Sequence, residues 1–220
     1  MGKDRRRALL LPLLAVCWNQ LVYYGGSFLA RNAPHVEMML PPDRMIPLLP
    51  WTVSIYFGCY LCWAAVYVLC ARQEKHAAFR FFLADFLSKA VCLLFFVLLP
   101  TTMPRPEIPG NTVWDDLMRF LYRIDAPYNL FPSIHCLVSW LCFIGARNHR
   151  GLPRWAAWAT GVMAVLVCFS TLTTRQHVVA DVAAGIILAE GCYYIAGRSF
   201  LLRPASRLLG LLTKEEAPAA

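Results

Sequence analysis

Long apolar runs separated by short polar segments dominate the chain. Residues 8–30 and 45–71 contain no Asp, Glu, Lys or Arg, and four later runs contain few. A transmembrane helix needs about 20 mostly apolar residues. The pattern therefore predicts an all-α integral membrane protein, a bundle of six transmembrane helices in a single domain over residues 1–220. The expected spans are about 8–30, 45–71, 79–100, 132–147, 154–174 and 177–197.

Basic residues give the six spans an orientation. Two thirds of the 21 Lys and Arg residues lie at one side of the predicted bundle, in segments 1–8, 71–80, 146–154 and 198–220. Cytoplasmic loops carry the excess of Lys and Arg. We therefore expect a multi-pass protein of the cell membrane with both termini in the cytoplasm. The tail over 198–220 alternates Arg with Leu pairs, which fits either an amphipathic surface helix or a loosely ordered tail.

The longest segment between spans, residues 101–131, is external in this orientation. After several prolines, Asn111 or Thr112 is placed to cap a helix whose first turn contains Asp115. The sequence predicts a short helix from there to about Ile124, between spans three and four. Three aromatic residues in it suit the membrane surface: Trp114, Phe120 and Tyr122.

The composition agrees with a membrane protein. Of 220 residues, 59% are hydrophobic and 15% are charged, against about 45–50% and about 25% in soluble domains. These values exclude a water-soluble globule and a disordered chain. The net charge of +8 is divided among short clusters between apolar runs, so no nucleic-acid partner is expected. The nine cysteines lie in or at the start of apolar runs, which favours buried thiols over disulfides or a zinc site.

Polar residues gather at the expected external ends of the spans. Arg105 follows the third span, Ser133 and His135 open the fourth, and Arg175 and His177 open the sixth. Asp181 lies one helical turn beyond His177. Each of these residues alone has a structural explanation as an anchor or a helix-end contact. Together they indicate a functional site, because ionisable groups at membrane depth are costly.

This set of residues suits phosphoryl transfer. Ser133 is placed as a helix N-cap, and free N–H groups at a helix start favour an anion. Arg105 and Arg175 offer charge-assisted hydrogen bonds to phosphoryl oxygens.

The two histidines and Asp181 supply the remaining chemistry. His177 and Asp181 are four residues apart and share one helix face, so the carboxylate can orient the imidazole as a nucleophile. His135 is then free to protonate the leaving oxygen and later to activate water. No carboxylate cluster is expected to hold a metal, and no cofactor is needed.

The same residues resemble three motifs of the type 2 phosphatidic acid phosphatase superfamily of lipid-phosphate enzymes. That family has Lys-x6-Arg-Pro, Pro-Ser-x-His and Ser-Arg-x5-His-x3-Asp. This chain has Leu98-x6-Arg105-Pro106, Pro132-Ser133-Ile134-His135 and Ser170-Thr171-x5-His177-x3-Asp181. The resemblance covers about residues 45–197. It implies that His177 becomes a phosphohistidine, that Asp181 orients it, and that His135 is the acid. It also implies phosphoryl binding by Arg105, Ser133 and Arg175, with Asn129 as a further candidate donor.

Two departures from the family pattern affect the expected substrate. Leu98 and Thr171 stand where the family has Lys and Arg, and Arg175 is a candidate replacement for one of these cations. Together with the stretch from Asp125 to His135, this change resembles the branch that includes inositolphosphotransferases of sphingolipid synthesis. Members of that branch transfer a phospho-headgroup between lipids.

The resulting expectation is a metal-independent lipid-phosphate phosphatase at the outer membrane face. Headgroup transfer at the same site is the close alternative. Two further hypotheses are a transporter or flippase and an inactive relative that binds lipid phosphates. The expected partners are a lipid phosphate and the surrounding membrane lipids. Several lipid phosphates share the same phosphoryl group, so the motifs predict neither the substrate nor the oligomeric state.

Other polar and aromatic residues in the spans have simpler interpretations. Asp85 and Lys89 are four residues apart and are expected to form a buried ion pair, with a headgroup contact by Lys89 as the alternative. Glu190 is expected to make a polar contact near the cytoplasmic edge. The aromatic residues from Trp51 to Trp63 are expected to form a lipid-facing or helix-packing surface.

Overall fold

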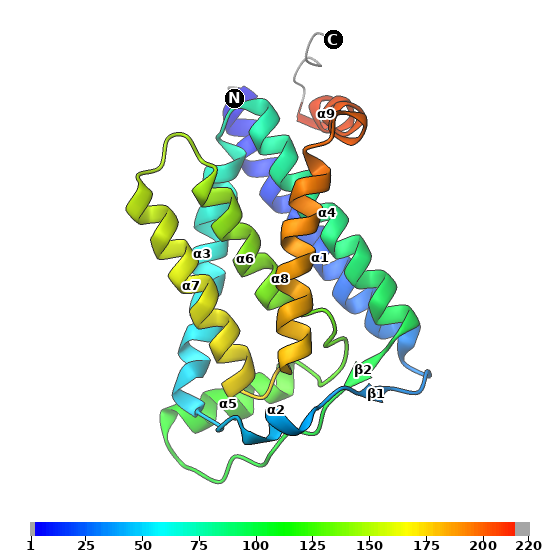
Figure 1. Cartoon of the computed structure of the whole chain (residues 1–220), viewed down its shortest axis with the longest axis vertical. Coiled ribbons are helices and arrows are strands. Elements are labelled where there is room, and N and C mark those ends of the chain that lie inside the picture. Colours follow the sequence, from blue (N-terminus) through cyan, green and yellow to red (C-terminus); the bar gives the residue numbers. More distant parts are fainter. Residues whose placement is uncertain (1–2, 214–220) are drawn as a thin grey trace.

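The computed structural model describes residues 3–213, which form an elongated helical bundle (Figure 1). Six helices run along its length: α1 (Lys3–Ala30), α3 (Val53–Ala71), α4 (Lys75–Leu98), α6 (Ile134–Arg147), α7 (Arg154–Thr173) and α8 (Val179–Ala196). Five of them are long and apolar enough to cross a membrane, all except α6. Large apolar side chains such as Leu61, Leu98 and Ile187 are more than two thirds exposed on these helices. The chain is therefore an all-helical, multi-pass membrane protein, apart from two very short strands.

Helix α6 is the short inner helix of the bundle. It has 14 residues, which corresponds to about 21 Å at 1.5 Å per residue, against about 30 Å for a bilayer core. It packs against α3, α4, α7 and α8, and most of its residues are buried. Helix α6 is therefore shorter than its four neighbours and enclosed by them.

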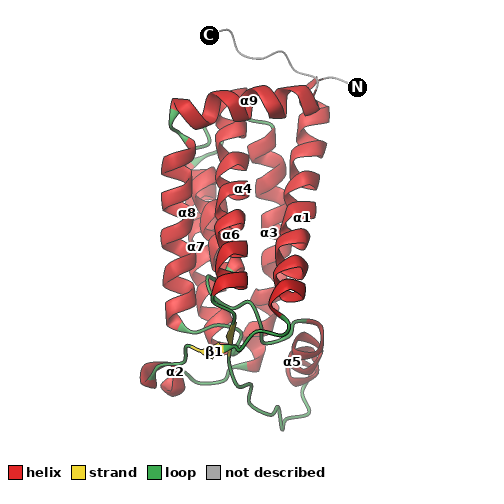
Figure 2. Ribbon diagram, turned by 90° about the vertical axis from the view of Figure 1, so that its right-hand side faces the viewer, coloured by secondary structure: helices red, strands yellow, loops and turns green. Residues whose placement is uncertain are grey.

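The two ends of the bundle differ (Figure 2). One end carries α2 (Pro41–Met45), the 3-10 helix η1 (Pro50–Thr52), α5 (Val113–Ile124) and the parallel strands β1 (Val36–Glu37) and β2 (Thr101–Thr102). Across the other end lies α9 (Ser199–Thr213), which packs against α1, α4 and α8. The remainder of the predicted tail, residues 214–220, lies outside the described residues.

One predicted span begins at the wrong residue. The span expected over 45–71 is helical only from Val53, and α2 and η1 precede it as separate short helices. Pro47 and Pro50 lie in this stretch. Proline cannot donate a backbone hydrogen bond and disfavours a helical residue before it. The prolines therefore break the apolar run, although none of its residues is charged.

Helix α5 is present between α4 and α6, as the sequence predicts. Thr112 is its N-cap: the Thr112 hydroxyl accepts from the backbone N–H of Asp115, and the Asp115 carboxylate accepts from the backbone N–H of Thr112. The Thr112 hydroxyl also donates to this carboxylate at 2.6 Å. This bond and the one from the Thr112 backbone N–H hold the pKa of Asp115 below its usual value. The reciprocal contact fixes the start of α5 and the direction in which it leaves the preceding loop.

Two predicted polar contacts inside the bundle are confirmed. Lys89 lies 2.8 Å from Asp85, both side chains are almost fully buried, and Tyr67 donates a 2.5 Å hydrogen bond to the same carboxylate. Glu190 accepts hydrogen bonds from Trp140 and Arg147. Both acidic groups are thus neutralised by neighbouring side chains.

Candidate active site

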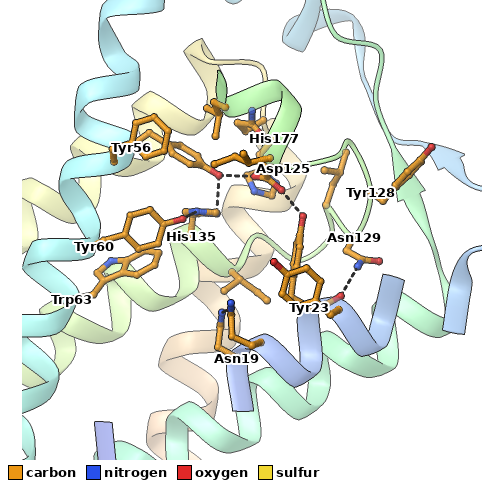
Figure 3. A pocket seen from close by; sticks show the side chains of 18 residues that line it. Asn19, Tyr23, Tyr56, Tyr60, Trp63, Asp125, Tyr128, Asn129, His135 and His177 are labelled. Atoms are coloured by element: carbon orange, nitrogen blue, oxygen red, sulfur yellow. Dashed lines mark hydrogen bonds between the residues drawn. The ribbon is translucent and has the colours of Figure 1, made fainter. Parts of the chain in front are cut away.

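A cavity of about 290 Å³ lies near the end of the bundle that carries α5 (Figure 3). Side chains of α1, α3 and α6, the segment that joins α5 to α6, and the turn before α8 line it. Both His135 and His177 are among the lining residues. Their ring centroids are 6.1 Å apart, so the structure brings two of the predicted catalytic residues to one cavity.

His177 and Asp181 form a direct pair at the start of α8. Nδ1 of His177 lies 3.2 Å from Oδ2 of Asp181, which also accepts the backbone N–H of Val178 at 3.0 Å. Because Asp181 only accepts, Nδ1 carries the hydrogen and Nε2 keeps its lone pair. Burial alone lowers the pKa of His177, but the hydrogen bond and the charge of Asp181 outweigh burial and raise this pKa above its ordinary value.

His135 lies in the first turn of α6 against aromatic side chains of α3. Its Nδ1 is 3.3 Å from the hydroxyl of Tyr56, and its Nε2 is 3.1 Å from the hydroxyl of Tyr60. The ring centroid of Trp63 lies 5.5 Å from that of His135. This aromatic stretch therefore packs between helices, as expected, and three of its residues also contact a predicted catalytic histidine, which the sequence analysis did not foresee. The signal in the sequence was the spacing of Tyr56, Tyr60 and Trp63, which places all three on one helix face.

Asp125 is a site residue that the sequence did not single out. It is the C-cap residue of α5, and its carboxylate accepts hydrogen bonds from Tyr23 and, at 2.9 Å, from Tyr56. The three residues come from α1, α3 and the end of α5, so only the packing of distant segments joins them (Figure 3).

Ser133 caps α6 and ties it to α8. Its hydroxyl accepts from the backbone N–H of Cys136 at 3.3 Å, and its own N–H donates to the carbonyl of Asp181 at 3.1 Å. The predicted N-cap is therefore confirmed. The Ser133 side chain is fully buried and is not among the cavity-lining residues, so in this structure it aligns the starts of the two helices that carry the histidines.

Arg105 lies behind the cavity wall. Its guanidinium donates to the carbonyl of Asp125 and, at 2.6 Å, to Oε1 of Gln176, and stacks 4.6 Å from the ring centroid of Tyr122. Burial lowers the pKa of Arg105. The structure therefore connects Arg105 to the cavity through Gln176.

Gln176 is a second site residue that the sequence analysis missed. It is 1% exposed and lines the cavity directly before His177. Arg105 occupies its Oε1, whereas its Nε2 is buried and has no hydrogen-bond partner among the described residues. A buried donor left without a partner is costly, which makes this amide a candidate for binding a substrate oxygen.

Arg175 is not brought to the cavity. Its φ is 53°, and its guanidinium donates to the carbonyls of Asp43 at 2.6 Å and Ile46 at 2.5 Å. These bonds fasten the turn before α8 to the segment around α2. With Arg44 and Arg105, it lines a separate and shallower hollow.

Asn129 lines the cavity, but its amide nitrogen, the predicted donor, is used within the protein. The amide donates to the hydroxyl of Ser27 at 2.6 Å and to the carbonyl of Tyr23 at 3.1 Å. Its φ of 57° lies in the left-handed region, which Asn tolerates better than most residues. Asn129 thus holds the segment before α6 against α1.

The two positions where the family has further cations do not supply a replacement. Leu98 is 78% exposed at the end of α4. Thr171 is buried, and its hydroxyl donates to the carbonyl of Cys168 at 2.8 Å. No Lys or Arg is among the described residues that line the cavity, which follows from the sequence departures at these two positions and from the hydrogen bonds that hold Arg175 elsewhere.

Comparison with known proteins assigns the family. No curated protein and no solved structure matches the chain. A family model described as the PAP2 superfamily matches residues 46–195, which is more than half of the chain. The matched region contains all three motifs. The chain therefore belongs to the PAP2 superfamily, the type 2 phosphatidic acid phosphatases, an enzyme family of phosphatases and phosphotransferases.

Proposed function

We propose that this protein is a membrane-embedded lipid-phosphate phosphatase that works through a phosphohistidine at His177. The observation that carries the proposal is the direct His177–Asp181 pair in a cavity that His135 also lines. A nucleophile with its orienting carboxylate and a separate acid are the groups that covalent phosphoryl transfer requires.

The first step transfers the phosphoryl group to the protein. The lone pair of His177 Nε2 attacks phosphorus, and the bond from phosphorus to the lipid oxygen breaks. His135 gives its proton to that oxygen, so a lipid alcohol leaves. Asp181 stabilises the positive charge that forms on the His177 ring. Its hydrogen bond to Nδ1 is already in place before the reaction.

The second step releases phosphate. His135, now neutral, takes a proton from water, and the water oxygen attacks phosphorus. The bond between phosphorus and Nε2 breaks, and inorganic phosphate leaves. His135 ends protonated and His177 neutral, as at the start. The two histidines supply the nucleophile, the acid and the base, so this scheme requires no metal.

Gln176 binds a phosphoryl oxygen in this proposal, and Arg105 supports it from behind the cavity wall. The Gln176 amide faces the cavity and donates to a phosphoryl oxygen, while Arg105 holds the other end of the amide and places a positive charge behind it. Ser133 contributes by fixing the start of α6, and Asn129 by holding the neighbouring segment. Arg175 would reach the phosphate only after leaving its present carbonyl partners.

The membrane arrangement is also part of the proposal. Helix α6 is taken as a sixth, shortened span, and the end with α5 as the external side. The support is the excess of Lys and Arg toward the α9 end and the aromatic residues of α5. The catalytic cavity then opens toward the outer leaflet of the cell membrane.

Headgroup transfer remains a second candidate because of the wall of the cavity that α1 forms. Asn19, Gln20, Tyr23 and Tyr24 line it. Their amides and phenols are uncharged hydrogen-bonding groups, and they could hold the hydroxyl of an alcohol acceptor where the phosphatase uses water. His177 would then carry the phospho-headgroup of a lipid phosphodiester, and the bond from phosphorus to Nε2 would break when the alcohol oxygen attacks phosphorus.

Phosphate release by the purified protein in detergent, with EDTA and a panel of lipid phosphates, tests the proposal. We expect the wild type to release phosphate and His177→Ala to release at least about 1,000-fold less, because the nucleophile is lost. A lipid phosphodiester is added to the panel to test transfer: loss of its phospho-headgroup only when an alcohol is present, with formation of a new phosphodiester of that alcohol, would support headgroup transfer. Equal rates for wild type and His177→Ala on every lipid would contradict both reactions.

A further inference from the structure

We propose that Asp125, acting through the hydroxyl of Tyr56, positions His135 for proton transfer. This inference rests on the proposed function, in which His135 is the acid and base. The observation is a continuous chain of hydrogen bonds: 2.9 Å from Tyr56 to Asp125, and 3.3 Å from Tyr56 to Nδ1 of His135 (Figure 3). Asp125 and Tyr56 are positioning residues, because neither reacts.

The available protons determine which group donates in each hydrogen bond of this series. A carboxylate only accepts hydrogen bonds, and a phenol has one proton to donate. Asp125 accepts from Tyr56, so the single proton of Tyr56 points toward Asp125. The oxygen of Tyr56 must then accept from Nδ1–H of His135. The tautomer is fixed, and Nε2 becomes the nitrogen that gives and takes the proton.

Packing holds both intermediate groups in place. Tyr56 is 1% exposed and belongs to an apolar cluster with Met118 and Leu121 of α5. The backbone N–H of Asp125 donates to the carbonyl of Leu121 at 3.0 Å, and its carbonyl accepts from Arg105. The carboxylate and the phenol are therefore anchored by the same helix, and Arg105 helps to fix the residue that orients His135.

A carboxylate thus orients each histidine, but the two carboxylates lie at different distances from their histidines. Asp181 touches His177 directly, whereas a phenol separates Asp125 from His135. A carboxylate in direct contact favours the charged form of an imidazole. Because Tyr56 separates Asp125 from His135, Asp125 favours the charged form of His135 less strongly. This weaker effect suits a group that releases a proton in one step and takes one in the next.

A pair of lipid substrates can isolate this role. One is a lipid O-phosphate, whose alkoxide leaving group needs a proton. The other is the S-linked phosphorothiolate of the same lipid, whose thiolate leaves without one. We expect Tyr56→Phe and Asp125→Asn each to slow first-turnover lipid release from the O-phosphate about 10- to 100-fold, the usual cost of removing a supporting partner. On the S-linked lipid, the loss should be less than about threefold.

The chain offers one matched control. Tyr67→Phe removes another buried tyrosine–carboxylate hydrogen bond from α3, the helix that also carries Tyr56, and Tyr67 is not among the residues that line the cavity. This variant should retain first-turnover release from the O-phosphate within about threefold of wild type.

The outcomes separate this inference from the proposed function. Equal losses on the two lipids would show a merely structural role and overturn the inference, as would unchanged release from the O-phosphate. If either of these results is found and His177→Ala is inactive, the proposed phosphatase function is retained and only this inference is rejected. Active His177→Ala would instead overturn the proposed function. Should Tyr56→Phe fail to fold, Asp125→Asn, which preserves the side-chain shape, decides the question.

Discussion

His177 and Asp181 lie one helical turn apart, and in the proposed mechanism their contact determines how His177, as the nucleophile, responds to pH. The hydrogen bond and the charge of the carboxylate raise the pKa of His177 above its ordinary value, which is about 6.5. Only the neutral imidazole has the lone pair that attacks phosphorus. A higher pKa therefore means that the reactive form appears at higher pH.

The acid limb of the activity profile should accordingly lie above about pH 6.5. We expect kcat/KM to rise through this limb, and Asp181→Asn to move the limb to lower pH because the charge that raises the pKa is gone. Kinetics from pH 5 to 9 with one lipid phosphate measure the shift. Ionisation of the substrate is the same for both proteins and cancels in the comparison. A limb that stays in place would contradict the role of Asp181.

At the scale of elements, the close approach of α6 and α8 aligns the two histidines. A side chain at Gly185 would place its Cβ 2.7 Å from the carbonyl oxygen of Ser133 and 3.2 Å from the backbone nitrogen of Leu137. Backbone atoms cannot move aside as the tip of a side chain can. The glycine therefore allows the contact in which Ser133 donates to the carbonyl of Asp181.

Gly185→Ala should push the two helices apart. We expect a loss of about 1–3 kcal/mol in stability, typical of overpacking, and a lower kcat from misaligned histidines. Gly191→Ala is the matched control, since it lies in the same helix and a Cβ there meets nothing within 4 Å. Thermal unfolding in detergent and phosphate release measure both effects. Similar behaviour of the two variants would argue against a tight α6–α8 contact.

The elements also show what sequence reasoning can reach. Apolar runs revealed the helices, and Thr112 and Ser133 revealed the caps, because these signals are local. The expected start of the second span lay before α3, because the apolar run contains no charged residue to mark its end and two prolines interrupt the helix. In the site, His135, His177 and Asp181 were visible from motif spacing. Asp125, Tyr56 and Gln176 were not, because their roles arise from contacts between distant segments.

At the scale of the whole molecule, the two ends of the bundle have different chemistry. α5, with its interfacial aromatic residues, lies near the cavity, and α9 with its arginines lies across the opposite end (Figure 2). The distribution of Lys and Arg supports the proposed orientation of the bundle, with the α9 end in the cytoplasm. In that orientation, substrate is processed at the outer side.

Labelling of intact cells tests the orientation. With exposed Cys17 changed to Ser, we expect a membrane-impermeant maleimide to react with Trp114→Cys on α5 in intact cells. Arg203→Cys on α9 should react only after permeabilisation. Both parent residues are exposed in the structure, so access to the reagent depends on the side of the membrane. The reverse pattern would place the cavity on the cytoplasmic side.

The first helix has a further consequence. The family match begins at residue 46, and the reacting histidines both follow it, whereas Asn19, Gln20, Tyr23 and Tyr24 of the cavity wall precede it. One part of the cavity wall therefore lies outside the region that the family shares, whereas both histidines lie inside it. Under the proposed function, exchanging α1 for another helix would change that part of the wall without replacing either histidine. Relatives with the same motifs and a different first helix would then differ in the molecules that they accept.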